Sequence, residues 1–206
     1  MKKILLVAFV LITSTNLFSQ NFTYGVVLGA SYIDGTVQKS SNSITESPPE
    51  KLDTHFGVFV DYQFSERFGV KLNTQYNRSY ERYRFYYIPN SFSDEFSINS
   101  IQLIPHLKFD VASESGYYKG GYLLVGPRMS FVLSAKDQSG NDVTNFYKST
   151  NFGAQFGFGV TIAKMFALEI LGDYGFSDIS ESEPMEIRTA GAYLNLNFNL
   201  ESIINK

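Results

Sequence analysis

Apolar side chains alternate with small or polar ones along this sequence, and this period of two limits the folds open to the chain more than any other feature. Residues 151–162 give the clearest case. Phe152, Phe156 and Phe158 occupy one set of alternate positions, whereas glycine, asparagine, glutamine and threonine occupy the other. Because successive side chains of a β-strand point to opposite faces, the pattern predicts a strand with one bulky apolar face and one small polar face.

Seven further stretches repeat this alternation, and the connections between the stretches alternate in length. The eight stretches are residues 22–32, 54–64, 68–80, 101–109, 122–133, 151–162, 166–176 and 188–200. Connections 65–67 and 163–165 are short and 110–121 is of modest length, whereas 33–53, 81–100, 134–150 and 177–187 are long or strongly polar. An even number of strands, with short turns at one end and long loops at the other, is typical of outer-membrane barrels.

The first 20 residues have the layout of a secretory signal peptide, with Lys2 and Lys3 before an apolar core and small or polar residues after it. We expect residues 1–20 to be cleaved and residues 21–206 to form the barrel domain. Losing two lysines takes the formal charge from −3 to −5, which gives no basic footprint for nucleic acid. The sequence has no cysteine, so disulfides, zinc–cysteine sites and cysteine nucleophiles are excluded.

Charged residues on the polar faces indicate which face is inside. Three acids and three bases balance there: Asp61, Lys71, Lys108, Arg128, Glu169 and Asp173. A narrow eight-stranded lumen has little room for phenylalanine-rich faces, and charges buried in it must be paired. We therefore predict an all-β fold, an eight-stranded antiparallel up-and-down transmembrane β-barrel, with these six residues forming a charge network in the lumen and lipid outside. A soluble lipocalin-like ligand-binding barrel is the alternative, because its strands also alternate.

Two features of the strand ends favour the membrane. Aromatic residues fall beside the predicted periplasmic turns or termini, as in the girdles of such barrels: Phe64, Phe68, Phe109, Tyr117, Phe166 and Phe198. The last stretch resembles the β-signal read by the outer-membrane assembly machinery through Thr189, Gly191, Leu194, Leu196 and Phe198, although eight residues follow Phe198. We expect outer-membrane lipid and, during biogenesis, this assembly machinery as partners.

Two short motifs carry a family resemblance. Residues 101–108 read IQLIPHLK and residues 122–128 read YLLVGPR, and this pair resembles the PorT-like outer-membrane β-barrel family of Bacteroidetes. The resemblance implies an eight-stranded barrel in the outer membrane and no catalytic residues; some members serve in protein secretion and gliding. Pro105 and Pro127 lie inside these stretches, where proline cannot donate to the ladder. We interpret them as two bulges; the alternative is a local break that opens the wall to lipid.

The histidines and one aromatic loop are the candidate sites. His55, near the external end of its stretch, and His106 could serve a lipid-modifying enzyme of the outer membrane, but no serine–histidine–acid spacing is present and we expect both to be satisfied polar residues. The loop over 82–96 could form a contact surface through Tyr83, Phe85, Tyr86, Tyr87 and Phe92. We favour the plainer interpretation, a hairpin whose aromatic side chains cover one another.

These observations favour a structural or binding barrel of the cell outer membrane over an enzyme. We expect no cofactor, no metal and no catalytic residue. The external loops are its expected binding surface, and an envelope or protein-secretion assembly is the expected setting.

Overall fold

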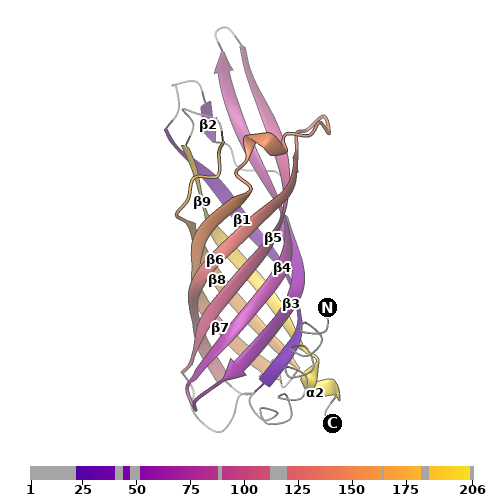
Figure 1. The fold of residues 1–206 in the computed structure, drawn as a ribbon, viewed down its shortest axis with the longest axis vertical. Coiled ribbons are helices and arrows are strands. Elements are labelled where there is room, and N and C mark those ends of the chain that lie inside the picture. The colour runs from indigo at the N-terminus through magenta and orange to yellow at the C-terminus, as the bar shows by residue number, and fades with distance from the viewer. Residues whose placement is uncertain are drawn as a thin grey trace, which may run out of the picture.

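The computed structural model is one antiparallel sheet that closes on itself, and each long strand pairs with its neighbours in the chain (Figure 1). It describes residues 22–39, 44–46, 52–87, 90–111, 120–163, 165–181 and 186–204. The strands are β1 (Phe22–Lys39), β2 (Ile44–Glu46), β3 (Asp53–Gln63), β4 (Phe68–Tyr87), β5 (Asn90–Asp110), β6 (Gly120–Lys136), β7 (Thr150–Ala163), β8 (Phe166–Gly175) and β9 (Glu186–Asn199). A 3₁₀ turn, η2 (Thr144–Phe146), and a short helix, α2 (Glu201–Ile204), complete the described elements.

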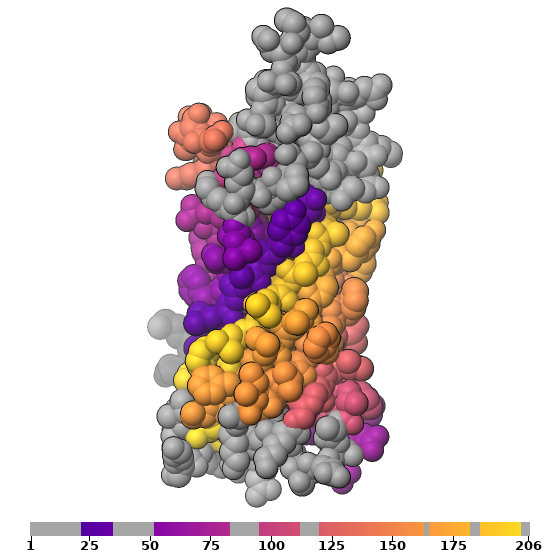
Figure 2. All heavy atoms as spheres, turned by 180° about the vertical axis from the view of Figure 1, so that it is seen from behind, coloured from indigo at the N-terminus to yellow at the C-terminus, as the bar shows by residue number. Residues whose placement is uncertain are grey.

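The barrel closes where β1 pairs with β9, so that the first and last long strands lie side by side. Figure 2 shows this seam as the indigo and yellow bands that cross the wall diagonally next to each other. The eight long strands follow one another around the ring in chain order. The short strand β2 pairs with β4 beyond the point where β3 ends. The predicted eight-stranded up-and-down barrel is confirmed. No described helix is long and apolar enough to cross a membrane.

Alternation along each strand puts apolar side chains outside and polar side chains in the lumen. On β7, Phe156 and Phe158 are 61% and 54% exposed on the outer face, whereas Gln155, which directly precedes Phe156, is fully buried. At the end with the short turns, Phe68 and Phe109 pack with ring centroids 5.1 Å apart, as do Phe166 and Phe198. Tyr117, the remaining girdle candidate on the modest connection, lies outside the described residues, as does the predicted signal peptide.

The main difference from the sequence-based expectation is the length of β4 and β5. Their ladder runs without a register shift from Phe68 opposite Phe109 to Tyr87 opposite Asn90, so most of the predicted 82–96 loop is strand. This hairpin stands beyond the rim of the barrel, at the end opposite α2 (Figure 1). The favoured interpretation of a hairpin is therefore correct for the backbone. The side chains of its five aromatic candidates lie outside the described part.

Pro105 and Pro127 do not form the two bulges that the sequence suggested. They face each other across β5 and β6, where the pairing skips three positions and then resumes in the same register. Since proline has no N–H, two opposed prolines remove both hydrogen bonds of one antiparallel pair. The ladders of β5 with β4 and of β6 with β7 continue past them. The wall therefore lacks hydrogen bonds at this point but keeps its register.

Candidate functional site

The six charged residues predicted for the lumen all lie there, and they form three ion pairs. Lys71 of β4 pairs with Glu169 of β8 across the barrel. Lys108 Nζ lies 3.1 Å from Asp61 Oδ2, which joins β5 to β3. The third pair joins β6 to β8, with 2.7 Å between the Arg128 Nε and Asp173 Oδ2 atoms. Each pair connects strands that are not neighbours, so these contacts bridge the interior of the barrel instead of lying along its wall.

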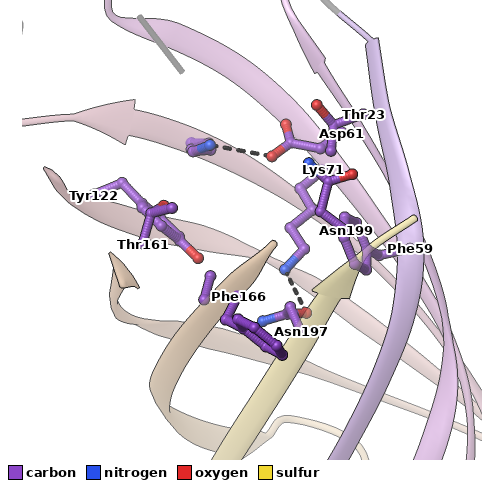
Figure 3. A pocket seen from close by; sticks show the side chains of 11 residues that line it. Thr23, Phe59, Asp61, Lys71, Tyr122, Thr161, Phe166, Asn197 and Asn199 are labelled. Atoms are coloured by element: carbon purple, nitrogen blue, oxygen red, sulfur yellow. Dashed lines mark hydrogen bonds and ion pairs between the residues drawn. The ribbon is translucent and has the colours of Figure 1, made fainter. Parts of the chain in front are cut away.

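Glu169 is the centre of the layer nearer the short-turn end. Besides Lys71, its carboxylate accepts hydrogen bonds from Tyr122 Oη at 2.8 Å and Asn195 Nδ2 at 3.2 Å. Lys71 Nζ also donates to Asn197 Oδ1 at 3.0 Å. Figure 3 shows Lys71 directed toward Asn197 on one side of the cavity that these residues line. A buried carboxylate with several charge-assisted donors is held in one orientation.

Aromatic rings cover the two lysines of this layer. Lys71 Nζ lies 4.7 Å from the centroid of the Phe59 ring, and Lys108 Nζ lies 4.5 Å from that of Tyr122. A cation above a ring face gains electrostatic attraction that grows when both groups leave water. Each lysine therefore has both a carboxylate and a ring as partners.

Nearer the external end, Arg128 holds a second polar layer together. Its Nη1 donates to Asn151 Oδ1 at 2.7 Å and its Nη2 lies 3.4 Å from Thr189 Oγ1, in addition to the bond with Asp173. The fork of the guanidinium thus contacts three further strands, β7, β8 and β9. A planar group with five donors suits this role better than a lysine would.

Between the two charged layers lies a layer of neutral polar groups. His55 Nε2 donates to Asn195 Oδ1 at 2.8 Å, and its ring lies 5.3 Å from that of Tyr193. Gln102 Nε2 donates to the Tyr193 hydroxyl at 3.2 Å and accepts from Gln75 at 3.0 Å. These contacts fill the middle of the lumen from several walls.

Three other residues of the middle layer are less well bonded. Both side-chain heteroatoms of His106, Asn73 and Gln155 lack a well-aligned partner among the described residues, although Gln155 lies beside His106. The expectation of a satisfied histidine is therefore met for one nitrogen of His55, since Nε2 is bonded and Nδ1 has no partner among the described residues, and it is wrong for His106. The strands fix the position of each Cα atom in the narrow lumen. A side chain there is buried whether or not a hydrogen-bond partner lies within its reach.

Two small cavities flank the middle layer. Each measures ≈ 40 Å³; one is lined by Asp61, Lys71 and Lys108, and the other by Glu81 and Arg128, among others. A water molecule needs about 10–15 Å³ by such a measure, so each cavity has room for a few waters and none for a lipid chain. Within the described residues, no group of three or more histidine, aspartate or glutamate side chains could hold a metal ion. Among the residues that the structure describes, the lumen is thus a packed polar core.

Comparison with protein families shows the family to which the chain belongs. The model of the outer membrane protein beta-barrel domain matches residues 18–181. The chain belongs to this family. It is an outer-membrane β-barrel protein, and the outward apolar band of the wall is its lipid-facing surface.

Solved structures with a similar fold belong to several bacteria. Ail of Yersinia pestis, in complex with a heparin analogue, is 14% identical; the alignment covers 87% of this chain and 99% of Ail, with a TM-score of 0.44. Neisserial surface protein A is 15% identical over 85% of this chain and 96% of that one, with a TM-score of 0.49. OprG of Pseudomonas aeruginosa is 12% identical over 87% and 96%, with a TM-score of 0.37. No curated protein matches the chain.

His55, the better candidate for lipid chemistry, does not reach the lipid side of this family barrel. It is 3% exposed, its ring faces the lumen, and Asn195 and Tyr193 occupy its surroundings. The sequence-based view did not place Phe59 and Tyr122 in the lumen. Strand parity could have found both, since Phe59 lies two residues before Asp61 and Tyr122 lies six before Arg128.

Proposed function

We propose that the barrel is an anchor that presents the β4–β5 hairpin outside the cell, where the hairpin binds a protein partner of the envelope. The hairpin carries this proposal. β3 pairs with β4 as far as Arg78, and β6 pairs with β5 as far as Ser97, but β4 and β5 continue together to Tyr87 and Asn90. Strands that extend so far beyond the wall are not needed to close a barrel.

The free sides of the hairpin support a binding role. The short strand β2 adds to β4 from Ile44 opposite Phe85 to Glu46 opposite Tyr83, so one edge already accepts a strand from the chain itself. On the other edge, β5 from Asn90 to Asp94 has no strand neighbour among the described elements. An unpaired edge offers backbone donors and acceptors to an incoming peptide strand.

The closed lumen supports anchoring over transport. Ion pairs bridge the interior at two levels, and the neutral layer fills the space between them. The motifs that resemble PorT-like barrels favour a protein-secretion or gliding assembly of Bacteroidetes as the setting. Strand β9, with Gly191 and Phe198, is the segment we expect the assembly machinery to read during biogenesis. In this proposal the protein binds a partner and has no catalytic activity.

Photo-crosslinking from both ends of the barrel tests the proposal. A photoreactive residue at Ser91, on the hairpin, should give a crosslinked protein product in intact cells, whereas one at Ser65, in the turn at the opposite end, should not give that product. Shortening the hairpin by replacing residues 82–95 with a two-residue turn should remove the product while the barrel stays folded and heat-modifiable on gels. Identical products from Ser65 and Ser91, or a product that survives the shortening, would contradict the proposal.

A further inference from the structure

The registers of β3 to β6 show where the apolar band of the outer face ends on one side of the barrel. One row of directly opposed outward residues is apolar: Phe56, Tyr76, Ile101 and Phe131. The next row toward the external end is polar: Thr54, Arg78, Asn99 and Ser134. Aromatic residues mark the interface of such barrels, so the hydrocarbon of the outer leaflet ends at the apolar row. The headgroups then lie at the level of the polar row.

Arg78 is a cation without an acidic partner at this level. It is exposed on the outer face, and its guanidinium carbon lies 5.4 Å from the centroid of the Tyr80 ring. Among the residues that the structure describes, no carboxylate pairs with it. A guanidinium stacked on a ring keeps its N–H groups in the plane of the fork, where a phosphate can be bound by two of them.

A β-bulge brings a second cation to the same side. The register of β5 with β6 shifts between Asn99 and Ser100, and beyond this shift Lys136 lies opposite Ser97 on the outer face, where it is exposed. Without the shift, the alternation of β6 would turn Lys136 inward. Lys136 forms no ion pair within the described ranges. Asp142, which bridges to it through the backbone, is near enough for the charge of Lys136 to act on its carboxylate, but the Oδ1 atom of that carboxylate accepts from Thr144 at 2.6 and 2.9 Å and forms no ion pair with Lys136.

Between these two cations the surface carries neutral donors. Asn99 Nδ2 donates to Ser134 Oγ at 3.0 Å, and both residues lie in the polar row of Arg78. A patch of this kind offers two positive charges and side-chain hydrogen bonds beside an apolar wall. The matching ligand has an anionic group attached to acyl chains.

We propose that Arg78 and Lys136, with Asn99 and Ser134 between them, bind the phosphate of a lipid in the outer leaflet. The apolar row below the patch contacts the acyl chains of that lipid, and the stacked guanidinium contacts its phosphate. The patch would fix the rotation and depth of the barrel in the membrane. It lies on the lipid-facing wall and is independent of the hairpin proposed to bind protein.

Native mass spectrometry of the folded protein in detergent, titrated with phosphorylated lipid A or with the same lipid A after removal of its phosphates, tests this patch. The unaltered chain should bind the phosphorylated lipid more tightly, and Arg78→Gln and Lys136→Gln should each weaken that binding about fivefold, as expected for one charge near a lipid surface. Both variants should bind the dephosphorylated lipid as the unaltered chain does. Arg67→Gln, which removes a charge from the turn at the opposite end, is the matched control and should leave binding unchanged.

Three results with the variants would overturn the proposal: unchanged binding by the double variant, an equal loss in the Arg67 control, or an equal loss for the lipid without phosphate. Arg78→Lys keeps the charge and should retain part of the affinity, which separates loss of the contact from misfolding. Millimolar inorganic phosphate should not displace the lipid, because the acyl chains contribute to binding. Displacement would assign the patch to free phosphate and overturn the lipid assignment.

Discussion

The charged layers of the lumen and the neutral layer between them both bury polar side chains, but the charged layers provide these side chains with more hydrogen-bond and ion-pair partners. Lys71, Lys108 and Arg128 each reach a carboxylate, and Glu169 accepts three hydrogen bonds. In the layer between, His106, Asn73 and Gln155 are as deeply buried but lack well-aligned partners. A buried charge without a partner costs several kcal/mol, whereas a neutral group costs about 1–3 kcal/mol. In these layers the charged groups are therefore paired, whereas the neutral groups between them are buried with or without a partner.

Neutralising Glu169 should have the largest effect on stability. Glu169→Gln leaves Lys71 buried without a counter-charge, and we expect the free energy of unfolding to fall by about 3–5 kcal/mol. Guanidinium unfolding of the barrel in lipid vesicles measures this change. The paired replacement Lys71→Met with Glu169→Leu removes both charges and should recover most of the loss. A paired variant as unstable as the single one would show that the carboxylate acts by shape and not by charge.

Asp61→Asn should cost less than the Glu169 change. Asp61 uses one carboxylate oxygen, since Oδ1 has no partner among the described residues, whereas the carboxylate of Glu169 accepts three hydrogen bonds. We expect a loss of about 1–3 kcal/mol in the same unfolding measurement. If this loss equals that of Glu169→Gln, then the number of hydrogen bonds to the carboxylate does not set the cost.

The two histidines allow a well-bonded and a less well-bonded side chain of the neutral layer to be compared. His106→Leu removes a ring whose nitrogens lack aligned partners, so we expect the unfolding free energy to change by less than about 1.5 kcal/mol in either direction. His55→Leu leaves Asn195 Oδ1 buried without its 2.8 Å donor and should cost about 1–3 kcal/mol. The same vesicle assay measures both. Equal losses would mean that His106 has a partner as good as that of His55.

These contrasts also show how far the sequence could lead. Alternation predicted the strands, and the charge balance on their polar faces predicted that Asp61, Lys71, Lys108, Arg128, Glu169 and Asp173 face inward. Which acid meets which base depends on strand order and stagger around the closed ring, and the sequence of one chain does not contain these explicitly. The long hairpin was underestimated, because the polar residues of β4 and β5 beyond the membrane break the apolar alternation that identifies a strand. The two prolines pointed to an irregular wall, but only the register shows that they oppose each other.

The Lys148–Asp178 pair extends the comparison of ion pairs from the lumen to water. It joins the external segment after β6 to the one after β8, with 2.7 Å between Lys148 Nζ and Asp178 Oδ2. Asp178 also accepts from the backbone N–H groups of Ser180 at 3.0 Å and Ile187 at 2.8 Å. Since Lys148 is 40% exposed, we expect the pair to contribute well under about 1 kcal/mol, far less than its buried counterparts.

The pH dependence of this external contact is the smallest effect we predict. Partial burial raises the pKa of Asp178, but the hydrogen bonds from Lys148, Ile187 and Ser180 outweigh it and leave that pKa below the ordinary 3.8. A lowered carboxyl pKa gives stability that is present above pH 3.8 and lost as the pH falls through the lowered value. The amide proton shifts of Ser180 and Ile187, followed by NMR, should therefore titrate below pH 3.8. Lys148→Gln should move this midpoint upward without abolishing it, since the two backbone donors remain, whereas Asp178→Asn should abolish it. A midpoint at or above 3.8 in the unaltered chain would mean that burial outweighs the donors at Asp178.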